Sequence, residues 1–237
     1  DRRGRPECRC WKRVSSGACC FGSVVPAFLW GVAVTNLIAG IPINEKMIYT
    51  GGFFDLLTPY TIVGGLAFLF VFLFHGTAFL TLRLAKSSLI MRCQQLALKT
   101  GVTAAIFFVL CMAMTLTYTD LFTKPLAAVA LVGAALFFVM AILSMKLAKG
   151  KASFLLSTAA IVATTIAFFA GLFPRLMVSS LNPDWSLTIT NAASSPYTLS
   201  VMTIAAAVFV PIVLIYQSWS YYIFRKRVTP KDAEEHY

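Results

Sequence analysis

Six long apolar runs are separated along the chain by short stretches rich in charge, proline and asparagine. The runs cover residues 21–41, 60–82, 102–118, 125–145, 154–173 and 197–224. Each is long enough to span a membrane, because a helix needs roughly 20 apolar residues, with a range of about 17–25, to cross the bilayer. The alternating ten-residue segments of a membrane β-barrel are absent from the sequence. The pattern therefore predicts an all-α, polytopic transmembrane bundle of about six helices.

Composition excludes a soluble fold. Hydrophobic residues make up 59% of the 237, and charged residues make up only 12%, against about a quarter in soluble domains. The net charge of +11 comes from basic residues in the segments flanking the runs, where they meet anionic lipid head groups. We therefore expect membrane lipid as a partner and no nucleic acid.

The basic residues also predict an orientation. Seventeen of the 20 Lys and Arg residues fall on the N-terminal side of the membrane, and only Lys46, Lys124 and Arg175 fall on the other side. The positive-inside rule then predicts that both ends of this chain are cytoplasmic. Aromatic residues near the ends of the runs are expected to be interfacial anchors; they are Tyr49, Tyr60, Tyr118, Trp185, Tyr197, Trp219, Tyr221 and Tyr222.

Residues 1–20 differ from the rest because they are basic and contain four of the six cysteines, Cys8, Cys10, Cys19 and Cys20. A metal site is one alternative, but this spacing lacks the paired C-x-x-C pattern of thiolate sites. In a reducing cytoplasm we expect no structural disulfides among them. We further expect Cys93 in a loop and Cys111 inside a helix as a small apolar residue.

His75, within FLFHGTAF, is the candidate for chemistry inside the membrane. It could ligate haem iron or relay protons. The interpretation we favour is that His75 packs between helices and bonds to a neighbouring carbonyl or hydroxyl. Gly76 beside it would permit close helix approach. The only other histidine, His236, lies in the tail. Acidic residues are expected at the outer surface and not in the spans: Glu45, Asp55, Asp120 and Asp184.

The last loop and last run contain specific turn and helix-breaking residues. Their polar and proline positions are Asn182, Pro183, Asn191, Ser194, Ser195 and Pro196. These residue types form turns and helix N-caps, so we expect an ordered cap on the outer face. Pro211 should kink the final helix.

This region resembles subunit II of cytochrome bd quinol oxidases. The matching stretches are FPRLMVSSLNP, NAASSPYTL and YQSWSYYIFRKRV, which includes Trp219, and upstream PAFLWGVAVTNLIAGIPI, FFDLLTPYTIVGGLAFL and FLFHGTAFLTLR. The resemblance begins near Phe21 and implies that the six runs are the last six of a nine-helix subunit. Residues 1–20 are then expected to reflect truncation or a shifted reading frame, followed by a transmembrane domain at 21–224 and a cytoplasmic tail at 225–237.

The resemblance also implies a function. The family's complex, in the bacterial plasma membrane, oxidises quinol and reduces dioxygen to water with two b-type haems and one haem d. These cofactors are expected on the sister subunit I, with this chain as its structural partner and no catalytic residue of its own; a small single-helix subunit is a further candidate partner. Two alternatives are a transporter, which broken helices and midplane polar clusters would indicate, and an independent haem protein using His75.

Overall fold

The computed structural model describes residues 6–223. Its long helices are α1 (Pro6–Ala39), α2 (Pro59–Arg83), α3 (Ser87–Tyr118), α4 (Pro125–Lys146), α5 (Gly150–Leu172) and α6 (Pro196–Ile223). Each contains a stretch long and apolar enough to cross a membrane. The predicted all-α class and the six spans are therefore confirmed. The predicted tail at 225–237, with His236, lies outside the described residues.

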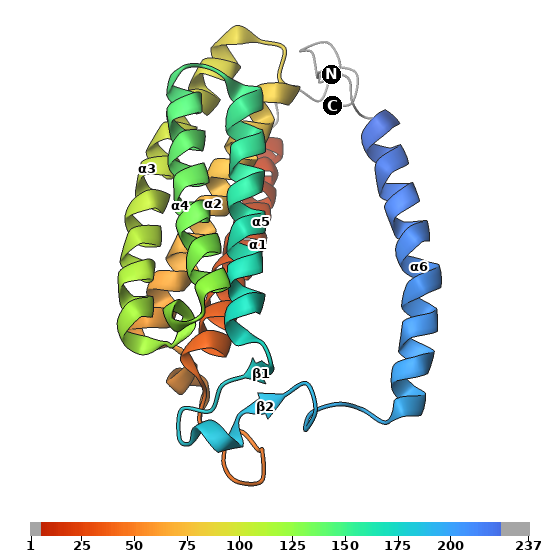
Figure 1. Cartoon of the computed structure of the whole chain (residues 1–237). Coiled ribbons are helices and arrows are strands. Elements are labelled where there is room, and N and C mark those ends of the chain that lie inside the picture. Colours follow the sequence, from red (N-terminus) through yellow and green to blue (C-terminus); the bar gives the residue numbers. More distant parts are fainter. Residues whose placement is uncertain (1–5, 224–237) are drawn as a thin grey trace.

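The connections differ at the two ends of the bundle (Figure 1). At one end, called here the turn end, residues 84–86 and 147–149 join neighbouring helices tightly. The other end, the loop end, holds all the short elements: η1 (Phe53–Leu56), η2 (Leu121–Thr123), β1 (Arg175–Met177), η3 (Pro183–Trp185) and β2 (Leu187–Thr188). The antiparallel β1–β2 ribbon was not predicted, because strands of two or three residues give no readable alternation.

Helices α1 and α3 begin much earlier than the sequence analysis predicted. Helix α1 starts at Pro6 rather than near Phe21. Helix α3 starts at Ser87 rather than near residue 102, so Cys93 lies in a helix and the expectation of a loop is wrong. The first turns of α3 carry Arg92, Gln94 and Lys99, which lower the local hydropathy without breaking a helix. Long basic side chains can extend toward the interface while their stems stay on apolar surface. Hydropathy therefore marks where the apolar core starts and not where the helix starts.

Glycines allow α1 and α2 to approach closely. A Cβ on Gly31 would lie 2.8 Å from the Cα of Gly65 and 2.9 Å from the carbonyl oxygen of Gly64. Both neighbours are backbone atoms that cannot rotate away, so this crossing requires glycine at residue 31. Small residues at a crossing are the usual way for membrane helices to gain packing contact. The expectation that Gly76 has this role is wrong, because a Cβ there would meet no atom within 4 Å.

The five helices α1–α5 form one bundle, in which α4 packs chiefly on α5 and α2 on α3. Phe74 and Phe138 meet in its centre with ring centroids 5.2 Å apart. Around them lie buried alanines of four helices, Ala78, Ala97, Ala104, Ala141 and Ala160. Small and aromatic side chains thus alternate in the core, which lets the helices interlock closely.

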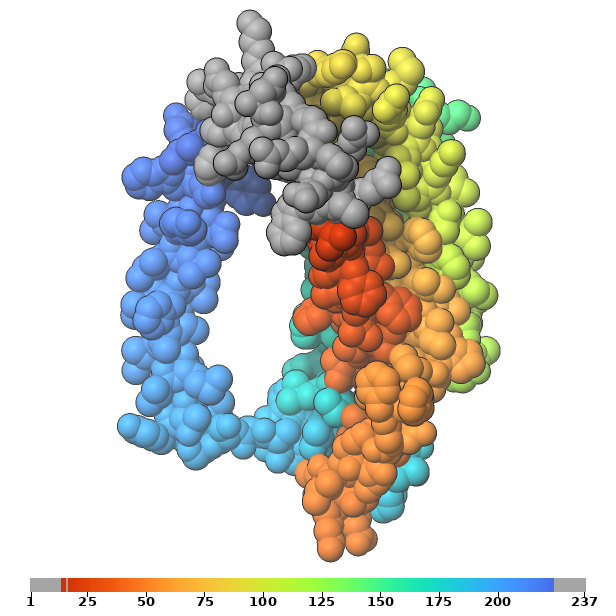
Figure 2. All heavy atoms as spheres, turned by 180° about the vertical axis from the view of Figure 1, so that it is seen from behind, coloured from red at the N-terminus to blue at the C-terminus, as the bar shows by residue number. Residues whose placement is uncertain are grey.

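Helix α6 stands apart from this bundle. None of its residues is buried, and Figures 1 and 2 both show an open gap between α6 and the side formed by α1 and α5. It is tethered at the loop end by the segment that follows β2. Pro211 lies inside this helix, and the predicted kink there stays a prediction.

Candidate functional site

His75 joins α2 to α5 inside the membrane-spanning part of the bundle. Its Nδ1 lies 2.8 Å from Ser157 Oγ, and its ring stacks on Phe154 with centroids 4.7 Å apart. Ser157 donates its hydroxyl proton to the Phe154 carbonyl at 2.8 Å, so the Ser157 oxygen accepts from the histidine. Nδ1 therefore carries the proton, and the predicted bond to a neighbouring hydroxyl is confirmed.

His75 is the one histidine among residues 6–223, and within that range no three His, Cys, Asp or Glu side chains gather as a metal site. Haem iron takes axial ligands such as histidine, and a ligating histidine commonly donates its other ring N–H to a neighbouring group. With Nδ1 bonded to Ser157, Nε2 is the nitrogen that His75 could offer to a metal. The side chains of Cys8 and Cys10 lie outside the described part, and Cys19 and Cys20 are exposed free thiols.

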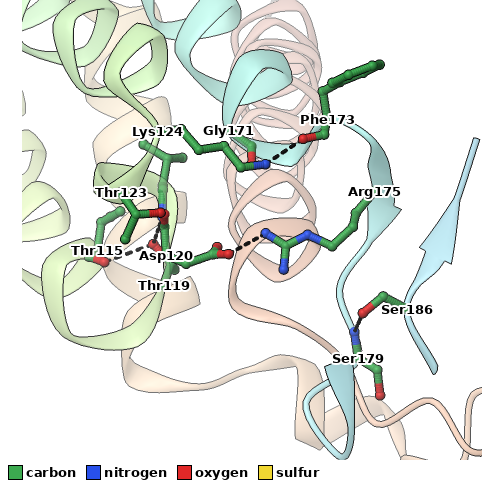
Figure 3. Close-up of polar contacts among 11 residues, drawn as sticks. Thr115, Thr119, Asp120, Thr123, Lys124, Gly171, Phe173, Arg175, Ser179 and Ser186 are labelled. Carbon is green, nitrogen blue, oxygen red and sulfur yellow. Dashed lines mark hydrogen bonds and ion pairs between the residues drawn. The ribbon is translucent and has the colours of Figure 1, made fainter. Parts of the chain in front are cut away.

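A charged cluster lies at the loop end, between η2 and the segment after α5 (Figure 3). Arg175 Nη2 lies 2.6 Å from Asp120 Oδ2. Lys124 Nζ donates to the carbonyl oxygen of Gly171 at 2.8 Å and also to that of Phe173. Those carbonyls lie at the C-terminal end of α5, where the helix has no internal donors left. Lys124 thus caps α5 from the start of α4.

The surroundings of Lys124 lower the pKa of its ammonium group. Its partial loss of hydration lowers the pKa of the ammonium group, the neighbouring Arg175 lowers this pKa further, and Asp120 opposes both effects. The cluster therefore holds two cations near one carboxylate. Carbonyl oxygens stabilise the second cation, in keeping with the favourable position of cations at a helix C-terminus.

Ser179 ties the loop after α5 to the loop after α1. Its Oγ donates to the Ile43 carbonyl at 2.9 Å, and its backbone N–H donates to Ser186 Oγ at 3.1 Å, the contact drawn in Figure 3. Backbone atoms of Ile41 and Ser179 also form a parallel bridge. Ser179 and Ser186 are buried. These contacts join two segments more than 130 residues apart into one cap over the loop end.

The residues predicted from the last loop form local turns of this cap. Asn182 accepts the N–H of Asp184 at 3.0 Å and so caps η3, which starts at Pro183. Ser195 accepts the N–H of Thr198 at 3.3 Å and caps α6, which starts at Pro196. The remaining members of the predicted set, Ser194, Pro211 and Trp219, are exposed.

Two buried polar contacts were missed by the sequence analysis. Asn36 in α1 donates to the carbonyls of Val32 and Leu56, each at 2.8 Å. Tyr60 is only 2% exposed, and its hydroxyl lies 3.0 Å from Thr115 Oγ1. The expectation that Tyr60 is an interfacial anchor is therefore wrong. Asn36 could have been recognised in the sequence as a lone amide near the end of an apolar run.

The acidic residues lie outside the spans, as the sequence predicted. Glu45, Asp55, Asp120 and Asp184 all fall in the connections of the loop end. The six membrane-spanning stretches, from Gly17–Ala39 to Pro196–Ile223, contain no Asp or Glu. The spans described here thus offer no carboxylate that could pass a proton.

Comparisons with known proteins agree with these features. The family of cytochrome bd terminal oxidase subunit II matches residues 2–224, so the resemblance extends upstream of Phe21. The chain is 34% identical over 236 residues to cytochrome bd ubiquinol oxidase subunit 2 of Bacillus subtilis, covering 97% of this chain and 68% of the relative. It is 27% identical over 270 residues to cytochrome bd-I ubiquinol oxidase subunit 2 of Escherichia coli K12, covering 99% and 71%.

Proposed function

The chain belongs to the cytochrome bd terminal oxidase subunit II family, and we propose that it works as the structural partner of a haem-bearing subunit I. The complex oxidises quinol and reduces dioxygen to water. In this proposal subunit I holds two b-type haems and one haem d. A single packed histidine and spans without carboxylates support the assignment of the chemistry to the partner.

The exposed helix α6 is the observation that carries the partner role. It has 28 residues and none is buried. The protein's own bundle, which ends at the α1 and α5 face, leaves a gap beside α6 (Figure 2). Lipid alone can solvate an apolar helix, but a helix held away from its own bundle is also available to other helices, which gain packing contact there.

We place this chain in the bacterial plasma membrane with the turn end in the cytoplasm. The support is the asymmetry of Lys and Arg, which concentrates cations at the turn end and in the two termini. The loop end then faces outward with its cap of η1, η3 and the β1–β2 ribbon. A small single-helix subunit and bound lipid are further candidate occupants of the gap.

Affinity purification tests this function directly. A tagged form of this chain, extracted from its own membrane in mild detergent, should bring down a haem-bearing membrane subunit. The purified complex should consume dioxygen when supplied with quinol. Haem spectra of wild type and of His75→Phe should match in haem content per complex, because the haem ligands belong to the partner.

Two outcomes would contradict the proposal. Purification without a haem-bearing partner would remove its basis. A stoichiometric haem retained by this chain alone and lost in His75→Phe would favour the independent haem protein instead. A transporter would be favoured if the purified chain moved a solute across vesicles while showing no quinol-dependent oxygen consumption.

A further inference from the structure

A pocket of about 500 Å³ lies at the turn end of the bundle, between the two tight connections found there. Helix α2 contributes Thr81 and Leu82 to its wall, and α3 contributes Ile90 and Gln94. Residues 148–152, which lead from the second connection into α5, complete the wall. None of these wall residues belongs to α1 or α6, so the pocket is separate from the gap beside α6.

Two lysines line this pocket without a carboxylate to balance them. Lys149 and Lys151 are both exposed, and neither ammonium group has a protein partner among the described residues. Within residues 14–223 every carboxylate lies in a connection of the loop end, at Glu45, Asp55, Asp120 and Asp184. Two like charges beside one pocket repel each other, so an anion bound between them would be stabilised.

The neutral polar groups of the wall also favour an anion. Gln94 is half-buried, and its side-chain amide has no hydrogen-bond partner among the described residues. An amide of this kind can donate two N–H bonds. With Lys149 and Lys151 it gives the pocket hydrogen-bond donors from two helices. Ammonium and amide donors of this type bind the oxygens of a phosphate group.

The apolar part of the wall distinguishes a lipid from a free anion. Leu82 and Ile90 line the pocket beside the polar groups and are half-buried. They lie where α2 ends, at Arg83, and where α3 begins, at Ser87, which is the level at which a bilayer changes from head groups to acyl chains. A free phosphate gains nothing from these side chains, whereas a phospholipid has an apolar part for them to contact.

We infer that this pocket binds the phosphate of an anionic phospholipid. The phosphate lies against Lys149, Lys151 and Gln94, and the glycerol and first acyl carbons lie against Leu82 and Ile90. The site is a built position for one lipid molecule and differs from the general attraction of the other basic residues to the membrane surface. It needs neither the sister subunit nor quinol.

Phosphatidylglycerol is the probe for this site, with phosphatidylcholine as the lipid without net charge. The complex is purified with the full chain, stripped of lipid in detergent and titrated with each lipid, and bound lipid is counted by native mass spectrometry. The pocket variant is Lys149→Gln with Lys151→Gln. The matched control is Lys86→Gln with Lys146→Gln, because Lys86 and Lys146 are exposed at the same two connections but do not line the pocket.

Wild type and the control variant should bind phosphatidylglycerol equally, and the pocket variant should bind it about thirtyfold more weakly, since two lysine charges near a lipid head group are lost. Equal weakening in both variants would show diffuse surface attraction and overturn the site. So would equal binding of phosphatidylcholine, displacement of the lipid by millimolar inorganic phosphate, or no retained lipid in wild type. None of these measurements uses quinol or dioxygen, so their failure leaves the proposed function unchanged.

Discussion

Lys124 shows how a charged residue can serve a membrane bundle without lying inside the membrane. It precedes α4 and donates to carbonyls at the far end of α5. The two helices pack extensively against each other. Lys124 thereby fixes where α5 ends relative to the start of α4.

Replacing Lys124 by methionine should lower the stability of the complex. The change removes hydrogen bonds from a cation to two carbonyls, and such bonds are worth about 1.5–3 kcal/mol in the protein interior, less at this half-buried position. We expect a lower midpoint of thermal unfolding in detergent. Lys46→Met is the control, because Lys46 lies exposed in the loop after α1. An equal effect of the two substitutions would contradict the capping role.

The lowered pKa of Lys124 gives this effect a pH dependence. The loss of hydration and the neighbouring Arg175 outweigh Asp120, so folding on balance favours the neutral amine. The folded protein therefore binds fewer protons than the unfolded chain between the lowered pKa and the ordinary value near 10.5. The contribution of Lys124 to stability therefore rises with pH in that window. The difference in unfolding temperature between wild type and Lys124→Met should therefore grow over a series of alkaline pH values. A difference that shrinks instead would contradict the lowered pKa of Lys124.

Some residue contacts could be predicted from the sequence and others could not, for a physical reason. The hydroxyl partner of His75 and the caps at Asn182 and Ser195 follow from the needs of single side chains or from local turn chemistry. The Asp120–Arg175 pair joins residues 55 positions apart. Asp120 and Arg175 are each a single charge in a different loop, and nothing in the sequence indicates that η2 and β1 meet.

At the scale of elements, the crossing of α1 and α2 depends on one glycine. A methyl group on Gly31 would meet backbone atoms of Gly64 and Gly65, so the helices must separate. Overpacking of this kind typically costs about 1–3 kcal/mol. Gly31→Ala should therefore reduce the yield and the unfolding temperature of the complex.

Gly76→Ala is the matched control for this crossing. It lies in the same helix pair, at a position where a Cβ meets no atom within 4 Å. Alanine is also the better helix former, so the control should be neutral or slightly stabilising. If both variants behaved alike, the close approach of α1 and α2 would not matter for stability.

Hydropathy located all six helices but misjudged two helix starts, those of α1 and α3, and one buried ring. The early turns of α3 contain charges that an apolar window rejects, and Tyr60 lies at a span end but faces Thr115. Neither the start of a helix beyond its apolar core nor the side on which a ring packs depends on mean hydropathy. Both depend on neighbours that the tertiary fold supplies.

At the scale of the whole molecule, α6 should be the helix most sensitive to loss of a partner. Ala206→Trp places a large ring on an exposed small position of α6. We expect less haem-bearing subunit to copurify with this variant. Ala113→Trp is the control, because Ala113 is an exposed alanine of α3, on the opposite side of the bundle from α6 (Figure 1). Equal recovery from both variants would show that α6 makes no contact important for assembly.

The separation of α6 from its bundle also bears on synthesis in the cell. Helix α6 leaves the ribosome after the other five and receives no packing from them, so a new chain enters the membrane with one helix solvated only by lipid. Under the proposed assembly, that helix finds its packing only when the sister subunit arrives. Balanced supply of the two subunits therefore becomes a condition of stability, since a chain made in excess keeps an unassembled helix open to membrane proteases.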